Sequence, residues 1–240
     1  MKKLKIYAMI PARLGSTRLK MKNLALIDGK PMISYAINAA KDAKCFDKII
    51  LNSEDNIFKK ISTRFNVDFY LRPNDLGSSN AKSDSVVENF MNYYSDADIV
   101  AWVNPISPFQ SGEEISNIVE YFIKNRLDSL ITVEEKQVHC NYMNKAINYD
   151  INGLFEQTQD LEPIQPFVYS VMMWRKDVFL KEFATNGHSL FCGNFGTYPV
   201  SKLSGIIIKD SDDLKIADSI MRVLNSEESN DIIEYDNIVN

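Results

Sequence analysis

The sequence has little of what marks several large classes of protein. Its three cysteines and two histidines are widely spaced and include no CxxC pair, which excludes a dense disulfide framework and the usual spacing of a zinc site. No stretch approaches the roughly 18 consecutive apolar residues of a membrane helix. The glycine-rich patterns GxxxxGK(S/T) and GxGxxG are also missing. We therefore expect a cytoplasmic protein with no membrane segment, and neither a P-loop NTPase nor a dinucleotide-binding protein.

The composition is that of an ordinary globular protein, but its charge is distributed unevenly. Hydrophobic residues make up 45% and charged residues 25% of the 240 residues, which argues against a disordered, collagen-like or coiled-coil chain. The net charge is -5, yet residues 1–30 contain eight basic side chains and one acidic side chain, Asp28. An acidic protein is a poor general binder of nucleic acid. A small anionic ligand held by the N-terminal segment fits this distribution better.

The hydrophobic pattern predicts strands that alternate with amphipathic helices. Buried strands are expected over 5–12, 48–53, 67–72, 98–104 and 129–135. One-sided helices are expected over 31–41, with Pro31 as first helical residue, and around 86–94 and 115–123. Continuous apolar strands between such helices are typical of a parallel sheet covered on both faces. The prediction is an α/β fold with a doubly wound, mostly parallel sheet in a single domain over 1–240.

The alternation fails between about residues 138 and 199, which we interpret as an insert. Its apolar run 167–174 suits either a strand buried against a partner subunit or a late strand of the same sheet. After the insert, residues 205–209 (GIIIK) are expected to form a last strand. Ser211 is expected to cap a helix that runs to Leu224, with Asp212 and Asp213 in its first turn.

The loop after the first strand carries the clearest chemical signal. It reads PARLGSTRLKMKN over residues 11–23, with two arginines and two lysines within ten residues. Gly15 and two hydroxyl residues lie between them, so that backbone N–H groups, guanidinium groups and ammonium groups are available together. These donor groups suit the binding of a triphosphate. The loop also follows the carboxyl end of a strand, where ligands bind in such sheets. A solvated basic loop is the alternative.

The sequence IPARLGSTRLKMKN resembles the nucleotide-binding signature of the acylneuraminate cytidylyltransferases, the CMP-sialic acid synthetases, and more distantly that of the CMP-Kdo synthetases. The resemblance continues into LALIDGKPMISYAINAAKDAKCFDKIILNSED, then into Leu71-Arg72-Pro73 with Leu76 and Ser83. It ends with the segment Asn104 to Pro108, NPISP, where the family usually has QPTSP. Four blocks therefore recur in order over most of the first 130 residues.

The resemblance implies a Rossmann-like nucleotidyltransferase that transfers CMP from CTP to an acidic 2-keto-3-deoxy sugar and releases pyrophosphate, for surface glycan biosynthesis. It also implies a homodimer formed through the insert, and Mg²⁺ carried with CTP. Carried over by position, the nucleotide site comprises Arg13, Gly15, Ser16, Lys22, Asn23, Arg72 and Ser83. Arg13 and Lys22 stabilise charge on the phosphates. The acceptor site comprises Asn104, Ser107 and Gln110, the last in place of an arginine.

The chain departs from the family where the metal is expected. Members carry an acidic pair in SIDIDTELD, and Ile207 and Lys209 occupy those two positions here. Exchanging a carboxylate for an ammonium reverses an interaction worth about 4 kcal/mol at 4 Å. Three explanations stay open: Lys209 takes over part of the electrostatic work as a catalytic residue, Asp210 or Asp212 reaches the metal through a slipped register, or the reaction is lost or changed.

Two other functions compete with this one. The altered acceptor-side residues allow a cytidylyltransferase for a phosphorylated or phosphonate acceptor. A non-catalytic homologue that binds the nucleotide is the second alternative. Several aromatic residues suit either a sugar pocket or a core and dimer interface, namely Trp102, Phe109, Tyr142, Phe167, Tyr169 and Trp174.

Overall fold

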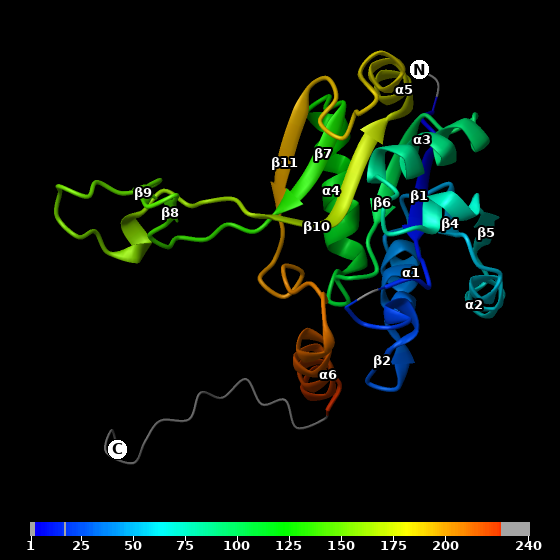
Figure 1. Cartoon of the computed structure of the whole chain (residues 1–240), viewed down its shortest axis with the longest axis horizontal. Coiled ribbons are helices and arrows are strands. Elements are labelled where there is room, and N and C mark those ends of the chain that lie inside the picture. The colour runs from blue at the N-terminus through cyan, green and yellow to red at the C-terminus, as the bar shows by residue number, and fades with distance from the viewer. Residues whose placement is uncertain (1–2, 17, 227–240) are drawn as a thin grey trace.

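The computed structural model, which describes residues 3–16 and 18–226, is built on a seven-stranded sheet (Figure 1). The strands follow the spatial order β11-β7-β10-β6-β1-β4-β5, and only β10 runs antiparallel to its neighbours. Their bounds are β1 Ile6–Pro11, β4 Lys48–Ser53, β5 Asp68–Leu71, β6 Ile99–Val103, β7 Ser129–Val133, β10 Phe167–Arg175 and β11 Phe195–Pro199. The five early strands and the mostly parallel α/β fold are confirmed.

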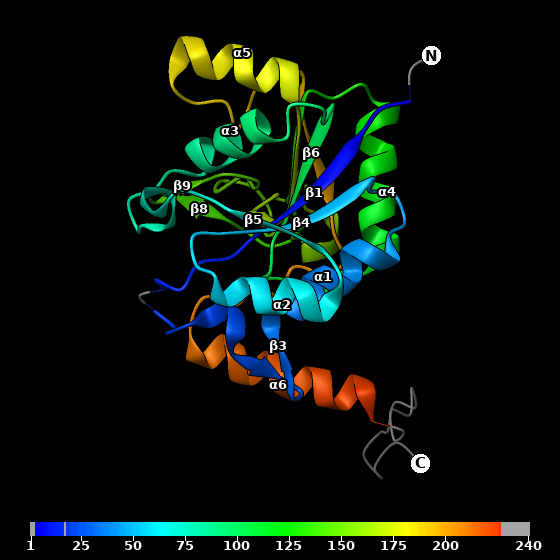
Figure 2. The ribbon, with the colours of Figure 1, turned by 90° about the vertical axis from the view of Figure 1, so that its right-hand side faces the viewer.

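Helices cover both faces of the sheet, as Figure 2 shows. Alternate residues of β1 divide the core, because Ala8 and Ile10 pack on one face while Tyr7 and Met9 pack on the other. The first face is covered by α1 (Met32–Asp42), α2 (Ile57–Phe65) and α4 (Gly112–Lys124), and the second by α3 (Ser83–Tyr93) and α5 (Lys176–Asn186). No helix among the described residues is long and apolar enough to cross a membrane.

The C-terminal helix α6 (Ser211–Asn225) packs outside these layers, against a small hairpin of β2 (Leu26–Ile27) and β3 (Lys30–Pro31) (Figure 2). Two expectations are wrong here. The helix cap is Asp210, whose side chain accepts from the N–H groups of Asp212 and Asp213, rather than Ser211. Residues 205–209 form no strand, because Ile208 instead donates to the carbonyl of Ile106 and packs into the core beneath α6.

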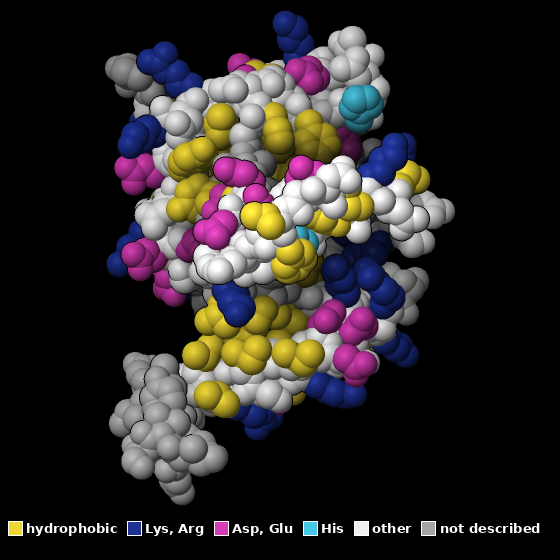
Figure 3. Space-filling model, turned by 90° about the vertical axis from the view of Figure 1, so that its left-hand side faces the viewer, with side chains coloured by type: hydrophobic (Ala, Val, Ile, Leu, Met, Phe, Trp, Pro, Cys, Tyr) yellow, Lys and Arg dark blue, Asp and Glu magenta, His cyan; other side chains and the backbone are white. Residues whose placement is uncertain are grey.

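Residues 138–199, interpreted above as an insert, lie in two different places. Residues 137–163 form an arm that leaves the sheet at the bridge between Lys136 and Ile164. The arm contains β8 (Asn141–Tyr142), β9 (Lys145–Ala146) and a 3₁₀ turn, η3 (Thr158–Asp160). Figure 3 looks along it and shows hydrophobic side chains on its surface, of which the most exposed are Met143, Leu154 and Phe155.

The rest of this region belongs to the main sheet. The apolar run 167–174 is β10, so it is a late strand of the same sheet, and it is followed by α5 and β11. The sequence interpretation overlooked α5, as it overlooked α2. Phe179 is the only fully buried side chain of α5, so that helix leaves only a weak apolar stripe. Helix α2 is amphipathic but has only nine residues, of which Phe58, Ile61 and Ser62 are buried. The proposed role of the arm in dimerisation stays a prediction.

A buried ion pair joins the carboxyl ends of β4 and β5. Arg72 Nη2 lies 2.8 Å from Glu54 Oε2, and the two side chains are only 4% and 14% exposed. The same guanidinium donates to the carbonyls of Ala12 and Asn52, and Glu54 Oε1 accepts from the N–H of Leu14 at 3.0 Å. The pair therefore connects both strands to the loop that follows β1.

We expect Glu54→Gln to lower the free energy of unfolding by roughly 3 kcal/mol, because removing one partner of a buried pair leaves an uncompensated charge. Glutamine keeps the shape and can still accept from Leu14, so the variant isolates the charge. Urea unfolding measures the effect. Lys215→Gln, which breaks the exposed pair with Asp212, is the control and is expected to cost less than about 1 kcal/mol. Equal stability of Glu54→Gln and the unaltered protein would contradict this role.

Candidate active site

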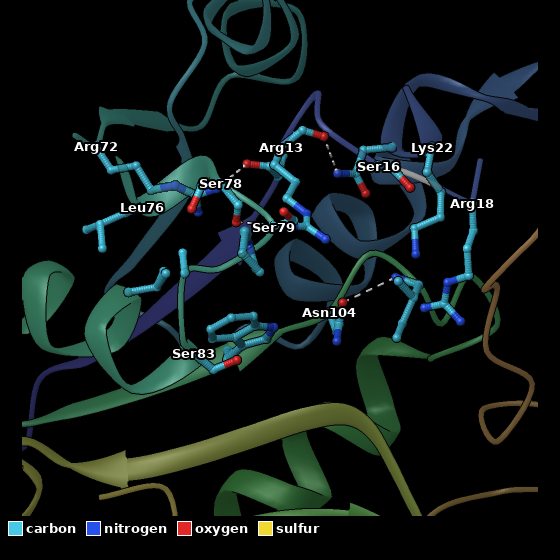
Figure 4. Close-up of a pocket in the computed structure, with 17 residues that line it drawn as sticks. Arg13, Ser16, Arg18, Lys22, Arg72, Leu76, Ser78, Ser79, Ser83 and Asn104 are labelled. Atoms are coloured by element: carbon cyan, nitrogen blue, oxygen red, sulfur yellow. Dashed lines mark hydrogen bonds between the residues drawn. The ribbon is translucent and has the colours of Figure 1, made fainter. Parts of the chain in front are cut away.

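A cavity of about 310 Å³ lies where the loops after β1, β5 and β6 meet the start of α3 (Figure 4). This is the edge of the sheet at which ligands bind in open α/β folds. In Figure 4, Arg72, Leu76 and Ser83 lie on one side of the cavity and Arg18 and Lys22 on the other, with Arg13 between them. The cavity is called the cationic pocket below. It is lined by Pro11, Ala12, Arg13, Ser16, Arg18, Lys22, Asn23, Arg72, Leu76, Ser78, Ser79, Ala81, Ser83, Val86, Trp102, Asn104 and Ile106.

The loop after β1 supplies three of the pocket's four positive charges: Arg13, Arg18 and Lys22. Lys22 begins a 3₁₀ turn, η1 (Lys22–Leu24), and its Nζ donates to the carbonyl of Ile208 at 3.1 Å. Burial lowers the pKa of Lys22, and the charges of Arg18 and Arg13 lower it further. The cations therefore repel one another until an anion enters between them.

Contacts on both sides hold this loop in place. Arg13 Nη1 donates to the carbonyl of Ser78 at 3.0 Å, and the buried Asn23 donates to the carbonyl of Arg13 at 3.4 Å. The backbone N–H of Leu14 donates to Glu54 Oε1. A charged loop fixed in this way costs less ordering free energy on binding than a mobile one.

The opposite side of the pocket is rich in hydroxyl groups. Ser78 and Ser79 follow the 3₁₀ turn η2 (Asn74–Gly77), and Ser83 is the first residue of α3. Arg72 also lines this side, and its guanidinium makes three hydrogen bonds within the protein, to two backbone carbonyls and to Glu54. Neutral donors and one guanidinium suit a polar, uncharged part of a ligand better than a second polyanion.

Asn104 forms part of the pocket after β6 and is held in one orientation. Its Nδ2 donates to the carbonyl of Tyr169 at 3.1 Å, and its Oδ1 accepts from Ile106. Tyr169 has φ 57°, a left-handed conformation that is unusual for an aromatic residue, at the point where the register of β10 shifts. The shift of register in β10 thus orients the carbonyl of Tyr169 toward the side chain of Asn104.

Seven of the residues expected in the site line the pocket, and six do not. Those that line it are Arg13, Ser16, Lys22, Asn23, Arg72, Ser83 and Asn104. Those outside the lining are Gly15, Ser107, Gln110, Lys209, Asp210 and Asp212. The nucleotide set is therefore brought together almost complete, whereas the acceptor and metal sets are not.

The two acceptor residues outside the lining are used inside the protein. Ser107 is 1% exposed and donates to the carbonyl of Ser204 at 2.6 Å, while Gln110 is hydrogen-bonded to Glu114 of α4. Ser107 connects the loop after β6 to the segment before α6, whereas Gln110 connects it to the first turn of α4. Gly15 is exposed, and an added Cβ would meet nothing closer than 3.9 Å, so no close approach within the protein requires glycine there.

The carboxylates expected to reach a metal serve the start of α6. Asp210 is its cap, and the side chain of Asp212 is 82% exposed and paired with Lys215. Lys209 is exposed, and its backbone N–H donates to Asp213. Among the described residues no cluster of three or more potential ligands occurs, and no carboxylate lines the pocket. Because Mg²⁺ prefers carboxylate and phosphate oxygens, these pocket residues do not fit a metal held by the protein alone.

Sequence interpretation did not assign four polar residues of the pocket. Arg18 belongs to the same basic loop, so its charge was the available signal. Ser78 and Ser79 follow Gly77 in a run of small polar residues between two expected site residues, Arg72 and Ser83. Trp102 was left open between a sugar pocket and the core, and it lines the pocket.

The fold is similar to those of known nucleotidyltransferases. A CMP:2-keto-3-deoxy-manno-octonic acid synthetase complexed with CTP superimposes with a TM-score of 0.67 at 17% identity, covering 91% of this chain and 98% of that one. The 4-diphosphocytidyl-2C-methyl-D-erythritol synthase of Anaerococcus prevotii has a TM-score of 0.62 at 13% identity, covering 91% and 99%. At such identities the likeness concerns the fold alone.

Sequence relatives agree with this fold. The N-acylneuraminate cytidylyltransferase of Escherichia coli is 27% identical over 98% of this chain and 56% of its own length. The pseudaminic acid cytidylyltransferase of Campylobacter jejuni is 27% identical over 66% of this chain and 73% of its own length. The chain spans about half the length of the first of these relatives.

The family assignment rests on a match that includes the basic loop, the strands β1 to β7 and the whole arm. The sequence matches the family model described as Cytidylyltransferase over residues 7–166, which is more than half of the chain. This agrees with the resemblance seen in IPARLGSTRLKMKN and its companion blocks. The chain belongs to the cytidylyltransferase family.

Proposed function

We propose that the protein transfers CMP from CTP to an acidic 2-keto-3-deoxy sugar of the sialic acid type and releases pyrophosphate, in surface glycan biosynthesis. The observation that carries the proposal is the cationic pocket, which sets Arg13, Arg18 and Lys22 opposite a hydroxyl-rich side with Arg72 and Ser83. Relatives named for sialic acid, pseudaminic acid and legionaminic acid chemistry support this substrate class.

In this mechanism the acceptor hydroxyl attacks the α-phosphorus of CTP. A new oxygen–phosphorus bond forms, the bond from the α-phosphorus to the bridging oxygen breaks, and pyrophosphate leaves past Arg13, Arg18 and Lys22. Such a reaction needs little covalent work from the protein, so positioning and neutralisation of phosphate charge account for most of the catalysis. No carboxylate or imidazole lines the described pocket as a general base. We further propose that Mg²⁺ arrives on the phosphates of CTP.

The arm supports a homodimer as part of the proposal. Leu154 and Phe155 are 93% and 86% exposed, and Met143 is 79% exposed, so a large apolar surface has no cover within the described chain. Exposed apolar surfaces of this kind mark interaction sites. A cytoplasmic location is also proposed, because the three cysteines are widely spaced and include no CxxC pair.

A second candidate is a cytidylyltransferase with a phosphorylated or phosphonate acceptor. The observation that favours it is on the acceptor side, where Asn104 lines the pocket while Ser107 and Gln110 are occupied elsewhere. A panel of sialic acid-type sugars, Kdo, and phosphorylated or phosphonate compounds, with CTP, Mg²⁺ and a pyrophosphate readout, distinguishes the two. Binding of CTP with no pyrophosphate from any acceptor would identify a non-catalytic homologue.

With the acceptor that this panel identifies, we expect Lys22→Ala to lower kcat/KM roughly 100- to 1,000-fold, since it removes a charged donor to the phosphates. Lys20→Ala is the matched control. Lys20 belongs to the same loop but is exposed and outside the pocket lining, and its loss should change kcat/KM less than about 3-fold. Equal effects of the two substitutions would contradict the assignment.

The same assay tests the proposed catalytic role of Lys209. This residue is exposed and follows Ile208, whose carbonyl accepts from Lys22. An exposed charge is screened by water, so Lys209→Ala is expected to lower kcat/KM by about 3- to 10-fold, far less than Lys22→Ala. Full activity of Lys209→Ala would remove the hypothesis that this lysine does part of the metal's work.

The pH dependence of CTP binding provides a separate test. Burial and two neighbouring arginines lower the pKa of Lys22, and CTP favours the protonated, positively charged form. The KM for CTP should therefore rise with pH, beginning at a lower pH than an ordinary lysine with pKa about 10.4 would produce. In Lys22→Arg, which stays charged, this alkaline rise should disappear. A rise that persists unchanged in Lys22→Arg would assign it to another group.

A further inference from the structure

Trp102 lines the cationic pocket and carries an unpaired hydrogen-bond donor. It lies on β6, opposite Met9 of β1 and Met172 of β10, and lines the pocket two residues before Asn104. Its indole Nε1 is buried and has no hydrogen-bond partner among the described residues. A buried donor without a partner costs free energy and is uncommon in native structures. Within a binding pocket, an acceptor atom of the ligand explains it.

The other tryptophan of the chain does not share this property. Trp174 of β10 is fully buried, and its Nε1 donates to the carbonyl of Leu190 at 3.0 Å. Both indoles pack with the core cluster beneath α3 and α5. Of the two tryptophans, only Trp102 has an unpaired donor, so this property does not follow from the surroundings that the two rings share.

The position of Trp102 indicates which part of a nucleotide it meets. In Figure 4 the cations Arg18 and Lys22 lie on one side of the pocket, and Arg72 and Ser83 lie on the other. A nucleotide with its phosphates on the cations extends its base toward Arg72 and Ser83. Its ribose then lies in the middle of the pocket, beside the end of β6 that carries Trp102 and Asn104.

We propose that the indole N–H of Trp102 donates a hydrogen bond to a ribose hydroxyl oxygen of CTP, and that this bond makes the site prefer ribonucleotides to deoxyribonucleotides. The inference rests on the proposed function, since it takes CTP as the ligand of the pocket. An indole N–H only donates, so it requires an acceptor oxygen. Removing that hydroxyl leaves the donor unpaired again, which is how a polar site discriminates against a ligand that lacks the matching group.

The test measures the affinities of CTP, 2′-deoxy-CTP and 3′-deoxy-CTP by calorimetry. The unaltered protein should bind CTP more tightly than at least one of the deoxy analogues by about 2- to 10-fold, the range expected for one hydrogen bond. Trp102→Phe keeps an aromatic ring but loses the N–H, so this preference should fall toward 1. Trp174→Phe is the matched control, because it removes the other indole and should keep the preference.

Fluorescence provides a readout that does not depend on activity. The chain has only two tryptophans, so Trp102 is the sole indole emitter in Trp174→Phe, and Trp174 is the sole one in Trp102→Phe. Addition of CTP should shift the emission of Trp174→Phe, because a hydrogen bond forms at the indole. The emission of Trp102→Phe should stay the same.

Four results would overturn the proposal. In the first, Trp102→Phe keeps the full preference for CTP. In the second, it loses affinity for all three nucleotides by one common factor, which would indicate a packing role. In the third, it raises only the KM of the acceptor. In the fourth, the unaltered protein binds CTP and both deoxy analogues equally. Failure of the unaltered protein to bind CTP at all is different, because it would contradict the proposed function itself.

Discussion

The buried carboxylate of Glu54 is the contact on which the cationic pocket depends. One oxygen pairs with Arg72, and the other accepts from the backbone of Leu14 in the basic loop. Gly77 leaves room for it, because a Cβ at that position would lie 2.3 Å from the Glu54 side chain. The Glu54 side chain, which directly follows β4, therefore contacts the start of the basic loop, Arg72 and the turn η2, and each of the last three contributes to the pocket or its rim. The carboxylate of Glu54 balances the positive charge of Arg72, and Arg72 at the same time lines the pocket.

Much of the fold could be predicted from local pattern, because most of its early strands are buried on both faces and its helices α1, α3 and α4 have clear apolar stripes. Pattern failed at residues 205–209, whose isoleucines are apolar because they pack beneath α6 and not because they join a sheet. It left β10 undecided, because nothing local distinguishes a strand of the main sheet from a strand at an interface. Both outcomes depend on tertiary neighbours that no local window contains.

The site was predictable where side chains close in sequence act together, and not where distant segments meet. Arg13, Ser16 and Lys22 lie in one loop, so the resemblance grouped them, and the structure sets all three in the lining of one pocket. Ser107 also lies in a recognised block, but its partner, Ser204, comes from a segment 97 residues further along the chain. A sequence motif predicts where a residue lies along the chain. It does not predict the tertiary contacts that decide whether its side chain is available to bind a ligand.

The charge pattern of the pocket connects stability with function. Arg13, Arg18 and Lys22 share one loop, and their repulsion, together with burial, lowers the pKa of Lys22. Such repulsion destabilises the empty pocket, and an anion that enters between the cations relieves it. In the proposed reaction, binding of the triphosphate gains free energy from attraction and from the removal of repulsion, and both contributions would weaken after transfer of CMP and departure of pyrophosphate. The absence of carboxylates from the described lining follows the same logic, since a carboxylate there would relieve the repulsion in the empty state and weaken the preference for a polyanion.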